Sequence, residues 1–560
     1  MATINGSSRR RFVQGLAGSA AVLAGADRRA FGFDSHKRSE LSGTQFDLEI
    51  ANLPVNFTGR RRVATVVNGE LPAPLLRWRQ GDLISVRVKN RLPMPTSIHW
   101  HGLILPANMD GVPGLSFDGI DAGADFEYQF RVQQSGTYWY HSHSRFQEQT
   151  GLYGPIVIEP AAGERHAADR DYTVLLSDWT DEDPEHIFAT LKRNSEYFNF
   201  AQRTVGDFFS DVRVRGLRAT LAERRVWGEL RMNPTDILDV SGYTYTYLMN
   251  GVTSAGNWTG EFRRGERVRL RFINGSSMSF FDVRIPGLAM RVVAADGQDV
   301  EPVTVEEFRI GTAEIYDVIV EPVKEDAYTI FAQSMDGSGY ARGTLAPRAG
   351  LRGSIPAMDP RPILTMADMG KDMGSMAGMM PQVAPEDHNP AVDMRVSEPD
   401  TRLDDPGFGL RGNGRRVLSY ADLHTLGGAL DERPPGREIE LHLTGHMQRF
   451  IWSFDGQKFS QAKPLHFTHG ERLRIVLVND SMMTHPIHLH GMWSEIESPD
   501  GAFQVRKHTV VLRPGQKLSY RVTAGALGEW AFHCHLLYHM EAGMFRQITV
   551  APDDAASSPS

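Results

Sequence analysis

Histidine clusters are the residues of this chain most able to do chemistry. Ten of its twenty histidines fall in four short clusters. A single pair of histidines two residues apart is usually incidental in a strand, but four clusters together indicate a metal site, and imidazole is a good ligand for copper. The clusters are His99-Trp100-His101, His141-Ser142-His143, His485-Pro486-Ile487-His488-Leu489-His490, and His533-Cys534-His535 followed by His539.

The single cysteine of the chain, Cys534, lies between His533 and His535, so no intramolecular disulfide is possible. In a β-strand, residues i and i+2 project from one face and residue i+1 from the other. His533 and His535 therefore share a face, and Cys534 points toward a different metal. One thiolate, two imidazoles and a weak thioether are the ligand set of a blue-copper electron-transfer centre. The residues available to complete that set are His485, His539 and Met544.

Three segments align without gaps and predict equivalent strands in three parts of the chain. They are Gly81–Asn90, Gly265–Asn274 and Gly470–Asn479. Apolar residues alternate with polar ones at the same offsets in each, and a period of two predicts a half-buried strand. The segments between the copies are rich in short alternating runs separated by Gly, Pro, Asn and Asp, which is typical of β-sandwich domains.

The histidines keep the same distance from the repeat in its first and third copies. His99 and His101 follow Asn90 by nine and eleven residues, and the equivalent positions after Asn479 are His488 and His490. The second clusters also correspond, because one begins five residues after Gly136 and the other five residues after Gly528. Each outer copy therefore supplies four histidines, and the eight can hold a copper cluster. The middle copy has Val283 and Ile285 at these offsets, and we interpret it as a spacer.

These patterns predict an all-β protein of three β-sandwich domains, at residues 41–160, 170–350 and 415–552. Residues 357–405 are rich in Met, Asp, Gly and Pro and are expected to form a linker or insert before the third domain. Residues 184–222 have mixed periodicity that is compatible with helices. The hydrophobic fraction of 41% is ordinary for a globular protein, and the net charge of −8 gives no reason to expect nucleic acid as a partner.

The N-terminal residues 1–26 have the pattern of an export signal. Ser8-Arg9-Arg10-Arg11-Phe12-Val13 precedes an uncharged run of small and apolar residues from Gly15 to Ala26. This resembles a twin-arginine signal, with a small-residue cleavage site at its end. The pattern predicts a periplasmic protein that the twin-arginine translocase exports already folded, as suits a chain whose cofactor is loaded before export.

The four histidine motifs, in this order, resemble those of the multicopper oxidases, whose domains are Greek-key sandwiches of the cupredoxin kind. The resemblance implies four copper ions: one type 1, one type 2 and a pair of type 3. It implies that type 1 copper is bound by His485, Cys534, His539 and Met544. It gives type 2 copper to His99 and His488. It gives the type 3 pair to His101, His141, His143, His490, His533 and His535.

Within that family, nearly the whole chain resembles the periplasmic copper-resistance oxidases of the CopA/PcoA type. The segments that carry this resemblance include Leu105–Ser116, Gly242–Gly251 and Thr484–Trp493. It implies one-electron oxidation of Cu(I) or phenolic donors coupled to the four-electron reduction of O₂ to water, and partnership with other periplasmic copper-resistance proteins. Dioxygen reduction consumes protons, so nearby carboxylates are expected. The candidates are Asp110, where the resemblance implies an acid near type 2 copper, and Glu541.

A second hypothesis is a binding protein that sequesters copper through its methionines. Six methionines recur at three- or four-residue spacing between Met366 and Met380, and thioether sulfur suits Cu(I). The same spacing would also fit a core helix, although interleaved glycines weaken a helix. We expect this segment to modulate copper use without being needed for the chemistry. A copper nitrite reductase is excluded, because it would not need paired histidine motifs in both outer domains.

Overall fold

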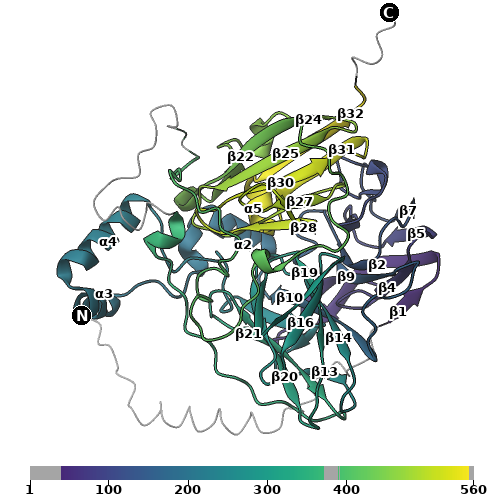
Figure 1. The fold of residues 1–560 in the computed structure, drawn as a ribbon, viewed down its shortest axis with the longest axis horizontal. Coiled ribbons are helices and arrows are strands. Elements are labelled where there is room, and N and C mark those ends of the chain that lie inside the picture. Colours follow the sequence, from purple (N-terminus) through teal and green to yellow (C-terminus); the bar gives the residue numbers. More distant parts are fainter. Residues whose placement is uncertain (1–38, 371–388, 390, 554–560) are drawn as a thin grey trace, which may run out of the picture. The chain divides into compact units, whose positions relative to one another are not determined.

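The computed structural model describes residues 39–370, 389 and 391–553 of the 560-residue chain. The predicted signal at residues 1–26 lies outside the described residues. The described residues fall in one compact unit, and their strands form six sheets. Figure 1 shows how these strands are arranged. The all-β prediction is therefore confirmed. The domain boundaries proposed from the sequence stay a prediction.

The first two sheets are built from residues 40–159 and share one hydrophobic core. Leu48, Val86 and Tyr128 contribute to that core from one sheet, and Trp78 and Trp100 from the other. One sheet has the order β1(Glu40–Ser42), β4(Leu75–Arg79), β9(Tyr153–Glu159), β8(Gly136–His141), β6(His99–His101). The other has the order β3(Arg62–Val67), β2(Gln45–Val55), β5(Leu83–Asn90), β7(Asp125–Arg131).

The next two sheets are built from residues 170–346. The seven-stranded sheet has the order β12(Val252–Thr253), β11(Tyr245–Met249), β10(Arg170–Thr180), β14(Val268–Asn274), β19(Ile315–Val320), β16(Met290–Ala295), β17(Gln298–Val305). The five-stranded sheet has the order β13(Trp258–Glu261), β21(Tyr340–Ala346), β20(Tyr328–Ser334), β15(Phe281–Arg284), β18(Glu307–Ile310).

The last two sheets are built from residues 437–551. The six-stranded sheet has the order β23(Ile451–Phe454), β22(Arg437–His446), β25(Arg472–Asn479), β30(Lys517–Thr523), β27(Ser494–Glu497), β28(Phe503–Lys507). The five-stranded sheet has the order β24(Leu465–Thr468), β32(Phe545–Ala551), β31(Gly528–Cys534), β26(His485–Leu489), β29(Thr509–Leu512). We refer below to the first, second and third sheet pairs.

The three aligned segments form equivalent strands, β5, β14 and β25, as predicted. Each ends in a fully buried asparagine whose side chain fastens the loop that follows. In the third pair, the Asn479 amide nitrogen donates to the carbonyl oxygens of Met483 and Arg513, and its oxygen accepts from the Ser481 backbone N–H. The next strand after each loop, β6, β15 or β26, begins nine, seven or six residues after the asparagine, yet the histidines of the first and third copies keep the same distance from it.

Helices connect and cover the sheets. Residues 184–222, whose periodicity was mixed, contain two α-helices, one 3₁₀ helix and the start of a third α-helix (Figure 1). The α-helices are α2(Pro184–Leu191), α3(Val205–Arg215), α4(Leu217–Glu229) and α5(Leu537–Ala542). The 3₁₀ helices are η1(Ala107–Met109), η2(Ser195–Phe198), η3(Met366–Met369), η5(Tyr420–Asp422), η6(Met447–Arg449) and η7(Phe459–Gln461). No helix in the described part of the chain is long and apolar enough to cross a membrane.

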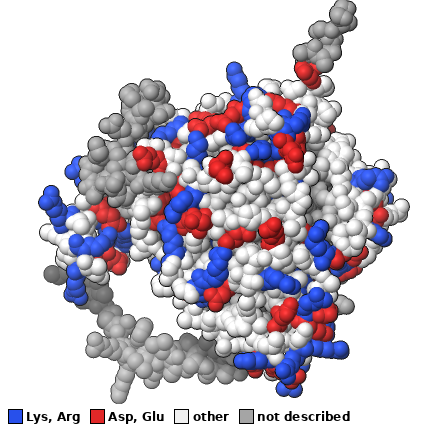
Figure 2. Space-filling model, viewed as in Figure 1, with Lys and Arg blue, Asp and Glu red and all other residues white. Residues whose placement is uncertain are grey.

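The methionine-rich region is described only at its two ends. Met369 ends η3 and is fully buried, and Met394 on the far side is also fully buried. Met373, Met376, Met379 and Met380 lie outside the described residues. On the face shown in Figure 2, Lys and Arg side chains are interspersed with Asp and Glu rather than gathered into a field of one sign.

The buried asparagine that ends each repeat strand should stabilise the fold even in the second sheet pair, where no histidine follows it. Asn274 donates to the carbonyl oxygens of Ser279 and Ile310 and accepts from the Ser276 backbone N–H, all in a buried setting. Because buried polar groups left without partners cost about 1 to 3 kcal/mol each, Asn274→Ala should lower the free energy of unfolding by at least that amount. Urea denaturation would measure it. The exposed Thr304→Ala serves as the control, and equal midpoints for the two variants would contradict the anchoring role.

Candidate metal centre

Paired strands bring the eight clustered histidines together from the first and third sheet pairs. In the first pair, β6 lies antiparallel to β8 and places His99 opposite His141. In the third pair, β26 lies antiparallel to β31 and places His488 opposite His533. The two arrangements are equivalent, as expected from the repeat. The histidines are buried, apart from His143, which is partly exposed.

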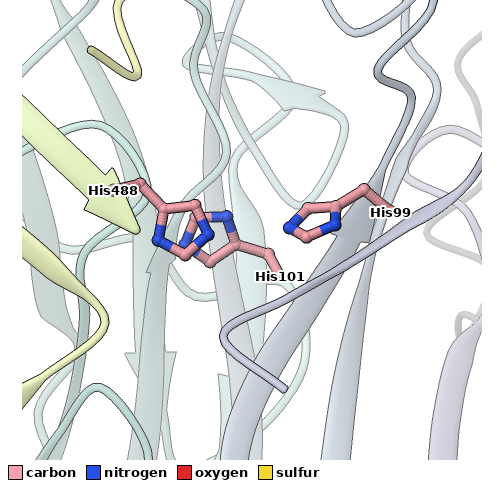
Figure 3. A group of neighbouring side chains, drawn as sticks. All are labelled: His99, His101 and His488. Atoms are coloured by element: carbon pink, nitrogen blue, oxygen red, sulfur yellow. The ribbon is translucent and has the colours of Figure 1, made fainter. Parts of the chain in front are cut away.

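The eight histidines form groups small enough to hold metal ions. Within each group, one ring nitrogen from every residue lies within 4.8 Å of the others. Figure 3 shows one group, in which His99 and His101 approach from one side and His488 from the other. The groups are His99, His101 and His488; His101, His141 and His535; and His143, His490 and His533.

The ring nitrogens that face the centre of the cluster are those left without partners. Among the described residues, no hydrogen-bond partner exists for the buried Nε2 atoms of His99, His141 and His488, or for Nδ1 of His101. The Nε2 atoms of His490 and His533 face each other at 3.1 Å. Buried polar atoms are normally paired, so these nitrogens fit metal ions as their missing partners.

The opposite nitrogen of several of these rings is held by a hydrogen bond. Nδ1–H of His99 donates to the carbonyl oxygen of Asp110 at 2.7 Å, and Nδ1–H of His533 donates to that of Cys534 at 3.0 Å. These bonds fix the tautomer and leave the Nε2 lone pair for a metal. Burial also lowers the pKa of His533 to about 3 and the pKa of His488 well below its usual value, so these two rings are neutral and able to bind a metal.

Asp110 joins ligands from both outer sheet pairs. Its side chain is 1% exposed, and its Oδ2 accepts from Nδ1 of His490 at 2.8 Å. Its backbone carbonyl holds His99, as described above. The next residue, Gly111, has φ +86°, and a Cβ there would lie 1.9 Å from the carbonyl oxygen of Ile98. Only glycine therefore allows the chain to turn so closely beside β6.

The second candidate site lies on the other face of β31. Sγ of Cys534 lies 3.5 Å from Nδ1 of His485 and 3.9 Å from Nδ1 of His539. The two Nδ1 atoms are 3.3 Å apart, so all three atoms surround one position. Burial raises the pKa of the Cys534 thiol, so metal binding must displace its proton.

The turn that includes α5 brings Met544 back to this site. The backbone N–H of Cys534 donates to the carbonyl oxygen of Met544 at 3.1 Å, and the N–H of Met544 donates to the carbonyl oxygen of His539 at 3.0 Å. The Met544 side chain is fully buried. The backbone of Met544 is thus bonded to two residues of this site, Cys534 and His539.

Two residues that the sequence analysis did not identify hold the distal nitrogens of this site. Nε2 of His485 bonds Oγ of Ser481 at 2.7 Å, and Nε2 of His539 bonds Oδ2 of Asp239 at 2.7 Å. Asp239 adopts a left-handed backbone conformation, and burial raises the pKa of Asp239 to about 8. It belongs to the second sheet pair's part of the chain, 300 residues from His539, and no local pattern indicates the contact.

Two further carboxylates have different partners: Glu148 contacts a histidine of the cluster, and Glu541 contacts an arginine. Glu148, which the sequence analysis missed, is 3% exposed and its Oε2 lies 2.7 Å from Nδ1 of His141. Its other oxygen has no hydrogen-bond partner in the described part of the chain. Glu541, predicted as a proton donor, instead forms an ion pair with Arg145. The catalytic roles of Asp110 and Glu541 stay predictions.

A cavity of about 510 Å³ lies beside Asp239. Its wall includes Asp236 and Asp239, each 2% exposed, and the aromatic residues Phe200 and Tyr243, which are more than half exposed. Burial and the neighbouring Asp239 carboxylate raise the pKa of Asp236 well above its usual value. One oxygen of each carboxylate lacks a hydrogen-bond partner among the residues described. The cavity can therefore receive a small molecule or ion that donates a hydrogen bond or carries positive charge.

Comparisons with known proteins agree with this geometry. Three family models, each described as multicopper oxidase, match residues 49–163, 170–351 and 432–554. Copper resistance protein A of Pseudomonas syringae pv. tomato and that of Escherichia coli are each 56% identical, over 97% of this chain and 99% of theirs. The multicopper oxidase MmcO of Mycobacterium tuberculosis is 30% identical, over 87% of this chain and 83% of its own.

Solved structures share the fold at lower sequence identity. The crystal structure of Fet3p, described as a multicopper oxidase that functions in iron import, has a TM-score of 0.66 and 18% identity, over 93% of both chains. The laccase from Botrytis aclada has a TM-score of 0.66 and 20% identity, over 93% of this chain and 90% of its own.

Replacing the Cys534 thiol should change one candidate site and leave the other unchanged. In Cys534→Ser the site formed with His485 and His539 loses its thiolate, so the copper-loaded variant should lack the intense visible band of a copper–thiolate bond. The eight clustered histidines are unchanged and should still bind copper. Absorption spectra with copper analysis would measure both effects, and circular dichroism would check folding. A folded variant that keeps the blue band would contradict the assignment of Cys534.

Proposed function

The chain belongs to the multicopper oxidase family, and we propose that its two sites are an electron-entry copper and a three-copper cluster where O₂ is reduced. The observation that carries this proposal is the end of β31, where Cys534 faces one site, and His533 and the following residue His535 face the other. The protein is a copper-resistance multicopper oxidase, an oxidoreductase with copper cofactors that takes electrons from a donor and passes them to O₂.

We assign the ligands by the groups that the fold brings together. Type 1 copper takes His485, Cys534, His539 and Met544. Type 2 copper takes His99 and His488. The type 3 pair takes His101, His141 and His535 on one side and His143, His490 and His533 on the other. Copper bound at these sites supplies the one-electron chemistry that a donor and O₂ require.

The chain's own residues connect and orient the sites. Cys534 is joined through the backbone to His533 and His535, so a short covalent path links electron entry to the cluster. Ser481 and Asp239 hold the distal nitrogens of His485 and His539, and so aim each Nδ1 at the thiol. Asp110 does the same for His490, and Glu148 for His141. Such outer partners commonly set both the tautomer and the ring orientation of a ligand.

The cavity beside Asp239 is the proposed donor site. Asp239 lines it and bonds Nε2 of His539, so a donor there is one hydrogen-bonded side chain away from an electron-entry ligand. Its buried carboxylate oxygens can accept a hydrogen bond from a phenolic hydroxyl group, and their charge attracts a cation such as Cu(I). Oxygen uptake with Cu(I) and with a phenol would distinguish these donors. Copper binding without oxygen uptake from either would favour the sequestering role instead.

The contact between Asp239 and His539 should be needed for donor oxidation. In Asp239→Asn the acceptor is weakened and the cavity loses a carboxylate, so kcat/KM for the donor should fall by about 10- to 100-fold, as is typical for partners of metal ligands. Steady-state oxygen uptake would measure this change.

Asp336→Asn is the matched control for this prediction. Asp336 lines the same cavity but bonds Ser334 and Ser338 rather than a ligand. It should leave kcat/KM within about twofold, the size of an ordinary surface change. Equal losses in the two variants would mean that the cavity needs negative charge and not the contact with His539.

We also propose that the protein works in the periplasm after twin-arginine export, alongside other copper-resistance proteins. The support is the sequence Arg9-Arg10 before an uncharged run, in a region outside the described residues. Replacing both arginines with lysine should retain the protein in the cytoplasm, because the translocase reads the arginine pair. Cell fractionation would measure it, and unchanged periplasmic activity would contradict this route.

A further inference from the structure

A three-residue turn of the third sheet pair touches two of the cluster's histidines. Lys507 ends β28, His508 is the single residue between the two strands, and Thr509 begins β29; all three are buried. Nε2 of His101 lies 3.1 Å from Nδ1 of His508 and 3.1 Å from Oγ1 of Thr509. Nδ1–H of His488 donates to the carbonyl oxygen of His508 at 2.6 Å. The turn therefore meets one ligand from the first sheet pair and one from its own.

These contacts orient His101 differently from its neighbours. Its Nε2 is engaged by the turn, so Nδ1 is the nitrogen that faces His141 and His535. His488, by contrast, uses Nδ1 for its hydrogen bond and presents Nε2 to the cluster. The rings of His101 and His488 nevertheless stack, with centroids 3.9 Å apart, as Figure 3 shows. A change in the turn would thus alter which nitrogen His101 presents.

The turn is held from the second sheet pair by Asp296, which is fully buried. Its Oδ2 accepts from the backbone N–H groups of His508 and Thr509, at 3.2 Å each, and lies 3.1 Å from Nζ of Lys507. Its Oδ1 accepts from the N–H of Ile315 at 2.9 Å, which fixes the carboxylate against β19. One side chain of the second pair thereby determines the position of both residues that contact His101.

Lys507 also attaches the turn to the second sheet pair. Its ammonium group is fully buried between Asp296 and Glu314, at 3.1 Å from each, and lies over the ring of Tyr316. Burial lowers the pKa of Lys507, but the two carboxylates outweigh this effect and hold the pKa above its usual value. A buried lysine is tolerated only with such partners, because an unpaired charge in the interior is very costly.

We propose that Asp296 and Lys507 are positioning residues for the copper cluster, acting through the turn at His508 and Thr509 to make His101 bind copper by Nδ1. The inference rests on the proposed function, since it needs copper at the histidine cluster. In this proposal, the second sheet pair helps to position a ligand of the cluster through Asp296. Without the Asp296 carboxylate, two buried N–H groups lose their acceptor and the Lys507 ammonium loses one of its two carboxylate partners, so the turn must move to find others.

Copper titration into copper-free protein tests this role. The variants are Asp296→Asn and Thr509→Val, with Thr509→Ser as the conservative change that keeps the hydroxyl group. The near-ultraviolet band reports the paired coppers, and the blue band reports the separate Cys534 site. Asp296→Asn and Thr509→Val should weaken copper binding at the cluster by about 10- to 100-fold and alter the near-ultraviolet band at full loading. The blue band should be unchanged, and Thr509→Ser should restore cluster binding.

Asp317→Asn is the matched control. Asp317 is equally buried in β19 and also joins two sheet pairs, through Arg271 and Thr137, but it contacts neither the turn nor a ligand. Asp317→Asn should unfold at a lower denaturant concentration than the parent protein, yet keep both absorption bands. If Asp296→Asn does not fold, the comparison of Thr509→Val with Thr509→Ser decides the question.

Two results would overturn the inference. One is a near-ultraviolet band and cluster affinity in Asp296→Asn and Thr509→Val equal to those of the parent. The other is a loss no larger at the cluster than at the Cys534 site, as a general destabilisation would give. If the proposed function is wrong, the parent protein itself lacks one or both absorption bands. This outcome is therefore distinguishable from the two results above, which concern the variants.

Discussion

The structure depends on a set of buried ring nitrogens that lack hydrogen-bond partners within the described residues. Each such group costs about 1 to 3 kcal/mol when left unpaired, and the cluster brings several of them to within 4.8 Å of one another. The opposite nitrogens of His99, His141 and His488 are bonded to carbonyls or carboxylates, so these three rings cannot turn to find other partners. Metal ions resolve this conflict, because they accept all the free lone pairs at once.

The two-residue period of a β-strand then divides the chemistry into two sites. Cys534 and its neighbours His533 and His535 occupy successive positions of one chain segment, yet they face different groups of ligands. The repeat places an equivalent pair of strands in the first sheet pair, so half of the cluster comes from each outer part of the chain. In the proposed assignment, this division lets electrons enter at one site and O₂ react at the other, with only a few covalent bonds between them.

Interpreting the middle copy as a spacer was incomplete. It has Val283 and Ile285 where the outer copies have histidines, but its part of the chain supplies Asp239 to His539 and Asp296 to the turn beside His101. Both contacts are polar and buried, so they resist small displacements of one sheet pair against another. The middle region therefore acts on both sites without supplying a metal ligand by itself in the proposed assignment.

Sequence patterns predicted the parts of the site that depend on local geometry. The strands of the repeat followed from alternation, and the separation of Cys534 from His533 followed from the same rule. The contact between Asp239 and His539 joins residues 300 positions apart, and that between Asp296 and His508 joins residues 212 apart. Neither follows a periodic pattern. Glu148 is close to its histidine in sequence, but only the fold of the turn after His143 brings the carboxylate back to His141.

The most direct test is a crystal structure of the copper-loaded protein with anomalous diffraction measured at the copper absorption edge. The proposed ligand assignment predicts one copper peak between Cys534, His485 and His539, and three peaks within the eight-histidine cluster, with His101 bound through Nδ1. Peaks elsewhere in the chain, or an empty histidine cluster beside an occupied Cys534 site, would contradict it.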